Sequence, residues 1–201
     1  MSRGPVIVRD VEVGDAEALQ AIWLDFAAEP DRMGRADAPV DQIRRAIDRL
    51  RSEPTERLLV AVVDGAPVGV AHLRRAPLSP IHDDKAVHVG YLHVLSAHRR
   101  RGIGRQLLDA AADWAEEQES THIVASVAAT ARDANRFLAR LGLGQVAVVR
   151  ASTVAHLRSR LPAAAHRSAA TTVGAARRLR RSSRRATWRT PALRASSRLV
   201  R

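Results

Sequence analysis

Residues 92–108 read LHVLSAHRRRGIGRQLL, and this stretch decides the expected fold. It begins in Val87–Leu95, whose apolar and aromatic residues are typical of a strand. Gly102 and Gly104 follow a cluster of arginines, and apolar residues from Ile103 onward recur at helical spacing. Two glycines at a helix N-terminus let the backbone approach a ligand, and the unpaired N–H groups and helix dipole favour an anion. The stretch therefore predicts a phosphate-binding loop; the alternative is a tight turn whose arginines face solvent, because short glycine motifs are weak signals.

The rest of the chain alternates between helical and strand patterns on either side of this stretch. The hydrophobic periodicity and the turn residues predict a mixed order in which most strands follow one another through hairpins or helices. Such an order indicates an α/β domain with a mixed sheet covered on both faces. Besides the strand and helix of the loop, we expect strands over residues 6–8, 58–63, 68–73, 123–127 and 146–149, and helices beginning near residues 15, 40, 130 and 153.

The composition excludes several classes of protein. The chain has no cysteine, so disulfide frameworks, thiolate metal sites and cysteine nucleophiles are excluded. No apolar run approaches the length of a membrane helix, and the N-terminus lacks the build of a signal peptide, so we expect a cytoplasmic protein. The formal net charge is +12, but thirteen arginines and no acidic residue lie from Arg158 onward. The basicity therefore belongs to the C-terminal end and not to the body.

Two segments resemble one known family. Residues 92–108 resemble the acetyl-CoA-binding motif of the Gcn5-related N-acetyltransferase (GNAT) superfamily: a hydrophobic strand, Arg or Gln, two variable residues, Gly-x-Gly, and an amphipathic helix. Arg99, Gly102 and Gly104 occupy the defined positions. Residues 134–143, ANRFLARLGL, are similar to the family's later helix. The resemblance spans about residues 5–161, and a Rossmann fold fits less well because the motif follows the fourth strand and not the first.

The resemblance implies an α/β fold with a mixed, mostly antiparallel central sheet, helices on both faces, and splayed fourth and fifth strands. It also implies that this N-acetyltransferase domain, residues 1–161, moves the acetyl group of acetyl-CoA, as co-substrate and without a metal, to a primary amine. Backbone groups of the fourth strand would meet the pantetheine arm, and loop N–H groups would bind the pyrophosphate. The implied binding residues are His93, Val94, Arg99, Arg100, Arg101, Gly102, Ile103, Gly104 and Arg105. The alternative is a coenzyme A-binding module with little or no catalysis.

The sequence departs from the family where catalytic residues are expected. Many members carry a tyrosine that protonates the leaving thiolate, and Leu138 stands at that position here. A carboxylate that acts as base in some members would fall at Ser126, Gly90 or His88, and none of these is acidic. Positioning of the reactants alone supplies about 7–11 kcal/mol in favourable bimolecular reactions, so the departure bears on the mechanism more than on the reaction class.

Two residues are candidates for proton transfer. His88 has the chemistry of a general base, and Tyr91 could protonate the thiolate in place of the missing tyrosine. Strand periodicity predicts that His88 shares a face with Leu92 and Val94, and that Tyr91 and His93 share the opposite face. For both candidates the alternative is a side chain that only packs on the sheet.

The acceptor and other partners are less defined by the sequence. Asp83 and Asp84 in the loop 76–85, or Asp31 and Asp37, could attract a small-molecule or peptide amine, although the alternative is simple solvation. The scattered histidines predict no metal site. Residues 162–201, rich in Arg, Ala and Ser, are expected to form a solvated, disordered tail that the domain does not need. The alternative is a non-specific polyanion anchor. We expect no specific nucleic acid partner, no membrane, and a monomer or homodimer.

Overall fold

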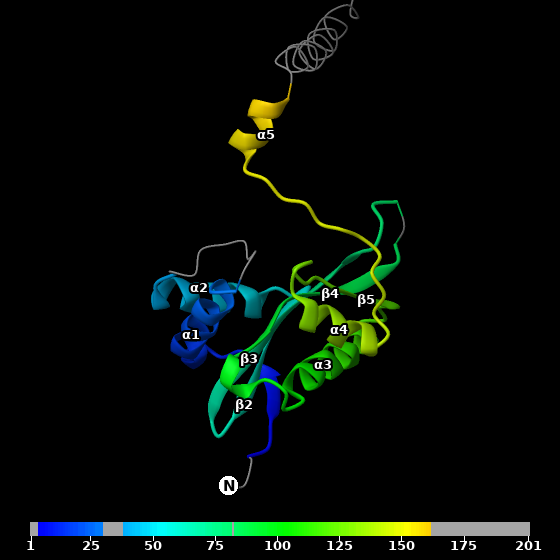
Figure 1. Ribbon diagram of the computed structural model, residues 1–201. Coiled ribbons are helices and arrows are strands. Elements are labelled where there is room, and N and C mark those ends of the chain that lie inside the picture. The colour runs from blue at the N-terminus through cyan, green and yellow to red at the C-terminus, as the bar shows by residue number, and fades with distance from the viewer. Residues whose placement is uncertain (1–3, 30–37, 82, 162–201) are drawn as a thin grey trace, which may run out of the picture. The chain divides into compact units, whose positions relative to one another are not determined.

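The computed structural model describes residues 4–29, 38–81 and 83–161 (Figure 1). The chain divides into two compact units, Met1–Ala147 and Val148–Arg201. The tail expected over residues 162–201 and the candidate acceptor residues Asp31 and Asp37 lie outside the described residues.

A five-stranded sheet forms the centre of the first unit, with strand order β1-β2-β3-β4-β5. The first four strands pair antiparallel, and β5 is parallel to β4. This arrangement confirms the expected mixed, mostly antiparallel sheet. The tight turn between β2 and β3 uses Asp64 and Gly65, both at positive φ, as hairpin turns that match strand twist require. The strands are β1 Ile7–Asp10, β2 Glu56–Val63, β3 Ala66–Pro77, β4 Lys85–Val94 and β5 His122–Ala125.

Helices cover both faces of the sheet (Figure 1). On one face, α1 (Ala16–Ala27) and α2 (Val40–Ser52) enclose a core cluster that includes Leu58, Val60 and Val62 of β2. On the other, α3 (Ile103–Glu117) and α4 (Arg132–Arg140) contribute to a second cluster with the alternate β2 residues Leu59, Ala61 and Val63. Because helices cover both faces of β2, neither of its faces meets water, and the strand is a continuous apolar run. Two short 3-10 helices, Val13–Asp15 and Ser96–His98, precede α1 and α3.

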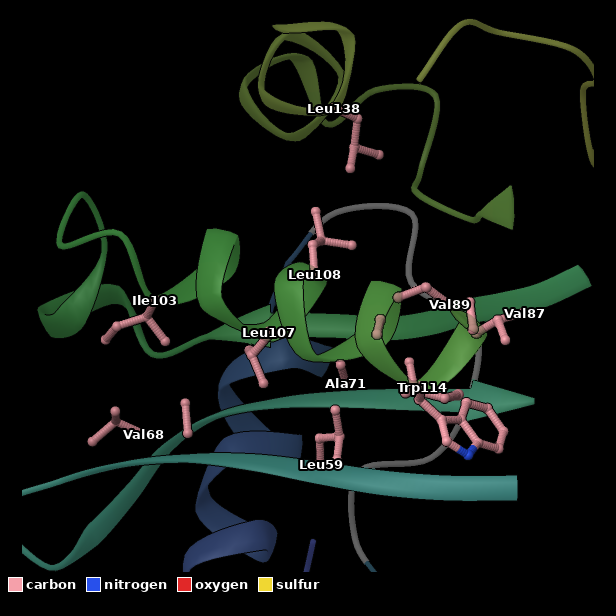
Figure 2. Packing of buried hydrophobic residues seen from close by; sticks show 14 of the residues in the cluster. Leu59, Val68, Ala71, Val87, Val89, Ile103, Leu107, Leu108, Trp114 and Leu138 are labelled. Carbon is pink, nitrogen blue, oxygen red and sulfur yellow. The ribbon is translucent and has the colours of Figure 1, made fainter. Parts of the chain in front are cut away.

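The second cluster explains why residue 138 is a leucine. Its side chain is 6% exposed and points toward Leu108 of α3, on the side of that helix away from Leu59 and Ala71 (Figure 2). The position where many family members carry a proton-donating tyrosine is therefore a packing position in this chain.

The pairing of β4 with β5 is short. It runs from Ala86 opposite His122 to Val89 opposite Ala125, and the N–H of Ser126 still donates to the carbonyl oxygen of Val89 at 3.0 Å. β4 then continues to Val94 without β5 beside it. The two strands part at Gly90 and Tyr91, as the expected splay requires.

The strand predicted over residues 146–149 is wrong. Val146 and Val149 are 87% and 84% exposed, and residues 144–150 form neither strand nor helix. Valines predict only that a segment suits a pleated surface, whereas a strand also needs a neighbour for its backbone hydrogen bonds.

In the second unit, α5 (Val154–Arg160) begins where Thr153 Oγ1 accepts a hydrogen bond from the His156 N–H, and none of its residues is buried. No helix in the described ranges is long and apolar enough to cross a membrane.

Candidate functional site

A β-bulge in β4 shapes the region where β4 and β5 part. The register between β3 and β4 shifts between Val70, opposite His93, and His72, opposite Gly90. Two β4 residues, Tyr91 and Leu92, therefore stand where β3 has one, and Tyr91 has a φ of +49°. A non-glycine residue at positive φ is uncommon and often marks a bulge or a functional position.

The bulge changes which residues share a face: Tyr91 and His93 lie opposite Leu92 and Val94 as predicted, but the predicted placement of His88 with Leu92 and Val94 is wrong. Leu92 and Val94 pack against the cluster beneath α3. Tyr91 stacks on Trp23 of α1, with ring centroids 5.8 Å apart, and His93 meets Phe26 of α1 edge-on. The extra residue shifts the alternation by one, because strand side chains alternate with a period of two. Tyr91 and His93 thus lie on the α1 side of the sheet, the side to which His88 also belongs because its neighbours Val87 and Val89 pack beneath α3.

The loop before α3 has the geometry expected of an anion site. Gly102 caps the helix with a φ of +80°, and Arg100 also has a positive φ. The first bonded N–H groups of the helix are those of Arg105 and Gln106, which both donate to the carbonyl oxygen of Gly102. The preceding N–H groups at the helix start have no such intrahelical acceptor, and the positive end of the helix dipole lies there. This arrangement fits the pyrophosphate of coenzyme A.

The other residues of the loop divide into exposed and structural ones. Arg100, Arg101 and Arg105 are exposed. Ile103 is 1% exposed and belongs to the core, so only its backbone is available to a ligand. A Cβ at Gly104 would lie 3.5 Å from Cζ of Phe137 in α4. Gly104 therefore permits close packing of α3 against α4, and a bulky replacement there would disturb the core as well as the loop.

Arg99 is directed away from the loop. Its Nε donates to the carbonyl oxygen of Val94 at 2.9 Å, and its Nη2 donates to Glu29 Oε1 of the segment after α1 at 2.6 Å. The same guanidinium lies 3.9 Å from Asp25 Oδ2. The side chain of this motif arginine thus joins the end of β4 to the carboxylates of α1 and its C-terminal flank.

His93 completes that network. Its side chain is 2% exposed, with Nε2 2.8 Å from Asp25 Oδ2 and Nδ1 3.7 Å from Glu29 Oε1. Burial lowers the pKa of His93 and outweighs the opposing effect of the hydrogen bond with Asp25. The imidazole is therefore neutral at neutral pH, and its burial leaves only backbone groups of His93 for a ligand.

His88 has the properties of a proton acceptor. Burial lowers its pKa, and the nearby Arg74 lowers it further, so the imidazole is neutral at pH 7. Its Nε2 is buried without a hydrogen-bond partner among the described residues. His88 lies on the last stretch of β4 that still pairs with β5.

Sequence reasoning missed a group of residues on the α1 side of the sheet. His72 Nε2 lies 3.0 Å from Glu56 Oε2, and the ring of His72 is 6.3 Å from that of Tyr91. Trp23 of α1 stacks on the ring of Tyr91. His72 could have been recognised in the sequence as a histidine inside an apolar strand. Trp23 could not, because it occupies one of the apolar positions that any core-facing helix has. The described residues contain no group of three His, Asp or Glu that could hold a metal ion. Asp83 and Asp84 are exposed in the loop between β3 and β4.

Comparison with known proteins agrees with this geometry. The sequence profile described as the Acetyltransferase (GNAT) family matches residues 17–143. This range includes the loop, the bulged strand and α4. No curated protein sequence matches the chain.

Solved structures share the fold at low sequence identity. A transcriptional regulator from Bacillus halodurans is 22% identical with a TM-score of 0.64, covering 74% of this chain and 99% of that one. Glucosamine-6-phosphate N-acetyltransferase from Arabidopsis thaliana is 12% identical with a TM-score of 0.63, covering 75% and 99%. An aminoglycoside N-acetyltransferase in complex with CoA is 14% identical with a TM-score of 0.61, covering 76% and 96%.

Proposed function

This chain belongs to the acetyltransferase (GNAT) family, and on that premise we propose that it transfers the acetyl group of acetyl-CoA to a primary amine. The observation that carries the proposal is the start of α3, where Gly102 holds a positive φ and N–H groups without intrahelical acceptors meet exposed arginines. This loop lies at the end of β4, the strand that parts from β5. The likeness of the fold to an aminoglycoside N-acetyltransferase solved in complex with CoA supports the same assignment.

Acetyl-CoA would supply an activated acetyl thioester. The N–H groups between Arg100 and Arg105 would hold its pyrophosphate, with Arg100, Arg101 and Arg105 adding positive charge. Backbone groups of His93 and Val94 would align the pantetheine arm. We assign Arg99 a positioning role, because its guanidinium is already bound to the Val94 carbonyl oxygen and to Glu29.

In the transfer, the amine nitrogen forms a bond to the acetyl carbon and the carbon–sulfur bond breaks. The amine loses a proton and the sulfur receives one. His88 is our candidate for the base, since its neutral imidazole has a free nitrogen beside the point where the strands part. Tyr91 is our candidate for the acid, because the bulge turns it to the same side of the sheet.

The burial of Leu138 favours a second candidate function, a coenzyme A-binding module with little or no catalysis. An assay of free thiol release from acetyl-CoA over a panel of amines, together with calorimetric binding of acetyl-CoA, distinguishes the two. Turnover with any amine supports the transferase. Binding of acetyl-CoA without turnover on any amine supports the module, and absence of binding contradicts both. A cytoplasmic location stays a prediction.

A further inference from the structure

A cavity of about 340 Å³ lies between α1, α2 and strands β2 to β4. Its volume is at the small end of the range of about 300–1,000 Å³ that is typical of ligand pockets. Most of its lining is apolar. The lining residues that bear on recognition are Trp23, Arg49, Glu56, His72 and Tyr91.

Aromatic rings form one wall of this cavity. The rings of Trp23 and Tyr91 are stacked with an angle of 28° between their planes, and His72 lies beside Tyr91. Tyr91 is 47% exposed despite these contacts, so its ring is accessible to a ligand. Such a wall binds a flat or branched apolar group, and an ammonium is also attracted to its ring faces.

One carboxylate lies inside the cavity. The side chains of Glu56 and His72 are 27% and 22% exposed and lie 3.0 Å apart. Arg49 also lines the cavity, but it is exposed on α2. A half-buried carboxylate interacts with a cation more strongly than an exposed one, because less water screens it. The cavity therefore suits a ligand with one positive charge and a small apolar body.

The cavity adjoins the place where acetyl transfer is proposed. Tyr91 is a wall residue and also the second residue after Val89, where β4 and β5 last pair. Gly90, between them, is opposite His72 in the sheet. Among the described residues outside its chain neighbours, no heavy atom lies within 4 Å of where a Cβ at Gly90 would stand. Open space thus lies over the strand between the cavity and the parting strands.

We infer that this cavity binds the acceptor, and that the acceptor is a primary monoamine whose body is compact and apolar, a single aromatic ring or a branched alkyl chain. The inference rests on the proposed function and adds the substrate class. Glu56 attracts the ammonium, the Trp23–Tyr91 wall packs on the body, and Gly90 leaves room for the amine to reach the thioester. The ammonium first gives one proton to the base and becomes the free amine. Its nitrogen then bonds to the acetyl carbon while the carbon–sulfur bond breaks, and a second proton passes from nitrogen to the leaving sulfur.

Multiply charged acceptors fit this cavity poorly. An aminoglycoside or a polyamine carries several ammonium groups, and Glu56 is the carboxylate that the lining provides. A second cavity of about 430 Å³, bordered by Arg9, Asp10 and Arg57, offers no alternative. Glu56 borders this cavity as well, but so do three arginines, and its described lining contains no aromatic ring on which an apolar body could pack. Two of these arginines are held by carboxylates, Arg9 by Asp15 and Arg57 by Asp10.

The test compares kcat/KM for thiol release with 2-phenylethylamine, isoamylamine, spermidine, kanamycin A and glucosamine 6-phosphate. We expect the two apolar amines to be preferred by at least about tenfold, since a mismatched body leaves apolar or polar groups unpaired. Gly90→Val and Trp23→Ala should each raise KM for 2-phenylethylamine by roughly fivefold or more, without changing acetyl-CoA affinity. Leu24→Ala, at a residue 52% exposed on the same helix, is the matched control and should change neither value.

Charge recognition is tested separately by calorimetry. Glu56→Gln should weaken binding of 2-phenylethylamine and leave binding of the uncharged 2-phenylethanol unchanged. Valine is an ordinary strand residue, and a Cβ at position 90 meets no neighbouring atom, so Gly90→Val should fold. It therefore tests the cavity even if Trp23→Ala fails to fold.

The outcomes separate the inference from the proposed function. Preference for spermidine or kanamycin A, or a Gly90→Val variant with unchanged KM, overturns the apolar acceptor and leaves the transferase in place. Turnover on no amine overturns the transferase. In that case the calorimetric data test whether the cavity binds the amine. Binding of 2-phenylethylamine that is weaker in Gly90→Val supports the cavity as its binding site, and absence of binding to the wild type overturns that assignment.

Discussion

His93 of β4 and Asp25 of α1 are 68 residues apart in the chain and meet at 2.8 Å between Nε2 and Oδ2. The contact ties the strand that ends at the proposed coenzyme A loop to the helix that carries Trp23. Glu29 and Arg99 extend it, so the end of β4, the loop after it and the acceptor-side helix are held by one polar network. Displacement of α1 would therefore disturb both proposed binding regions at once.

We predict that His93 makes stability depend on pH. Burial holds its pKa below the ordinary value of 6.5, so the unfolded chain binds a proton there more readily than the folded chain. The contribution is present above about pH 6.5 and is lost as pH falls toward the folded pKa. Between about pH 7.5 and about pH 5.5, urea unfolding should show a smaller loss of stability in His93→Gln than in the wild type. Equal losses in both proteins would contradict the prediction.

Gly102 should be required for binding and not only for the fold. A valine at positive φ is strained, so Gly102→Val should cost roughly 1–2 kcal/mol of stability and turn the first N–H groups of α3 away from the ligand. Gly65 has a φ of +81° in the β2–β3 turn, against +80° at Gly102. Gly65→Val is therefore a control with the same strain. Calorimetry should show weakened acetyl-CoA binding in Gly102→Val only, and equal loss in both variants would remove the loop from the binding site.

The exposed arginines of the loop should contribute charge. Replacing both Arg100 and Arg101 with alanine should weaken acetyl-CoA binding by about tenfold and flatten its dependence on salt, since screening acts on exposed charges. Arg45→Ala on α2 removes an exposed arginine away from the loop and serves as the control. A salt dependence that is unchanged in the double variant would place the pyrophosphate elsewhere.

His88 should control the acidic limb of the pH–rate profile. Because burial and Arg74 lower its pKa, the wild type should keep the free base, and its activity, somewhat below pH 6.5. His88→Ala should lower kcat by about a hundredfold near neutral pH and abolish this limb. His122→Ala changes an exposed histidine at the start of β5 and should leave the profile intact. A profile unchanged in His88→Ala would exclude this residue as the base.

Leu138 should behave as a core residue. Leu138→Ala should cost about 2–4 kcal/mol of unfolding free energy, because it leaves a cavity next to α3. Leu141, three residues later and 37% exposed, should cost less than about 1 kcal/mol when changed to alanine. Thermal or urea denaturation compares the two. Similar costs would show that α4 is loosely attached to α3.

Local patterns in the sequence were enough to predict most of the fold. The apolar run of β2 and the Asp64–Gly65 turn depend on nearby residues, and so does the periodic stripe of α3. Gly102 could be recognised for the same reason, because a helix cap that needs positive φ restricts the residue type at that one position. The chain's residues alone therefore predicted the strand, loop and helix of the proposed coenzyme A site.

Only the tertiary structure decided which side chains meet at the candidate site. The bulge at Tyr91 depends on the register between β3 and β4, and its one extra residue places His88 on the face of Tyr91 and His93 and not on that of Leu92 and Val94. Arg99 was expected in the loop, but carboxylates of α1 and of the segment after it hold its side chain. Residues 146–149 have the composition of a strand and form none in the described structure. The physical reason is common to all three: strand register, ion pairs and strand partners are contacts between residues far apart in the chain, so local pattern does not determine them.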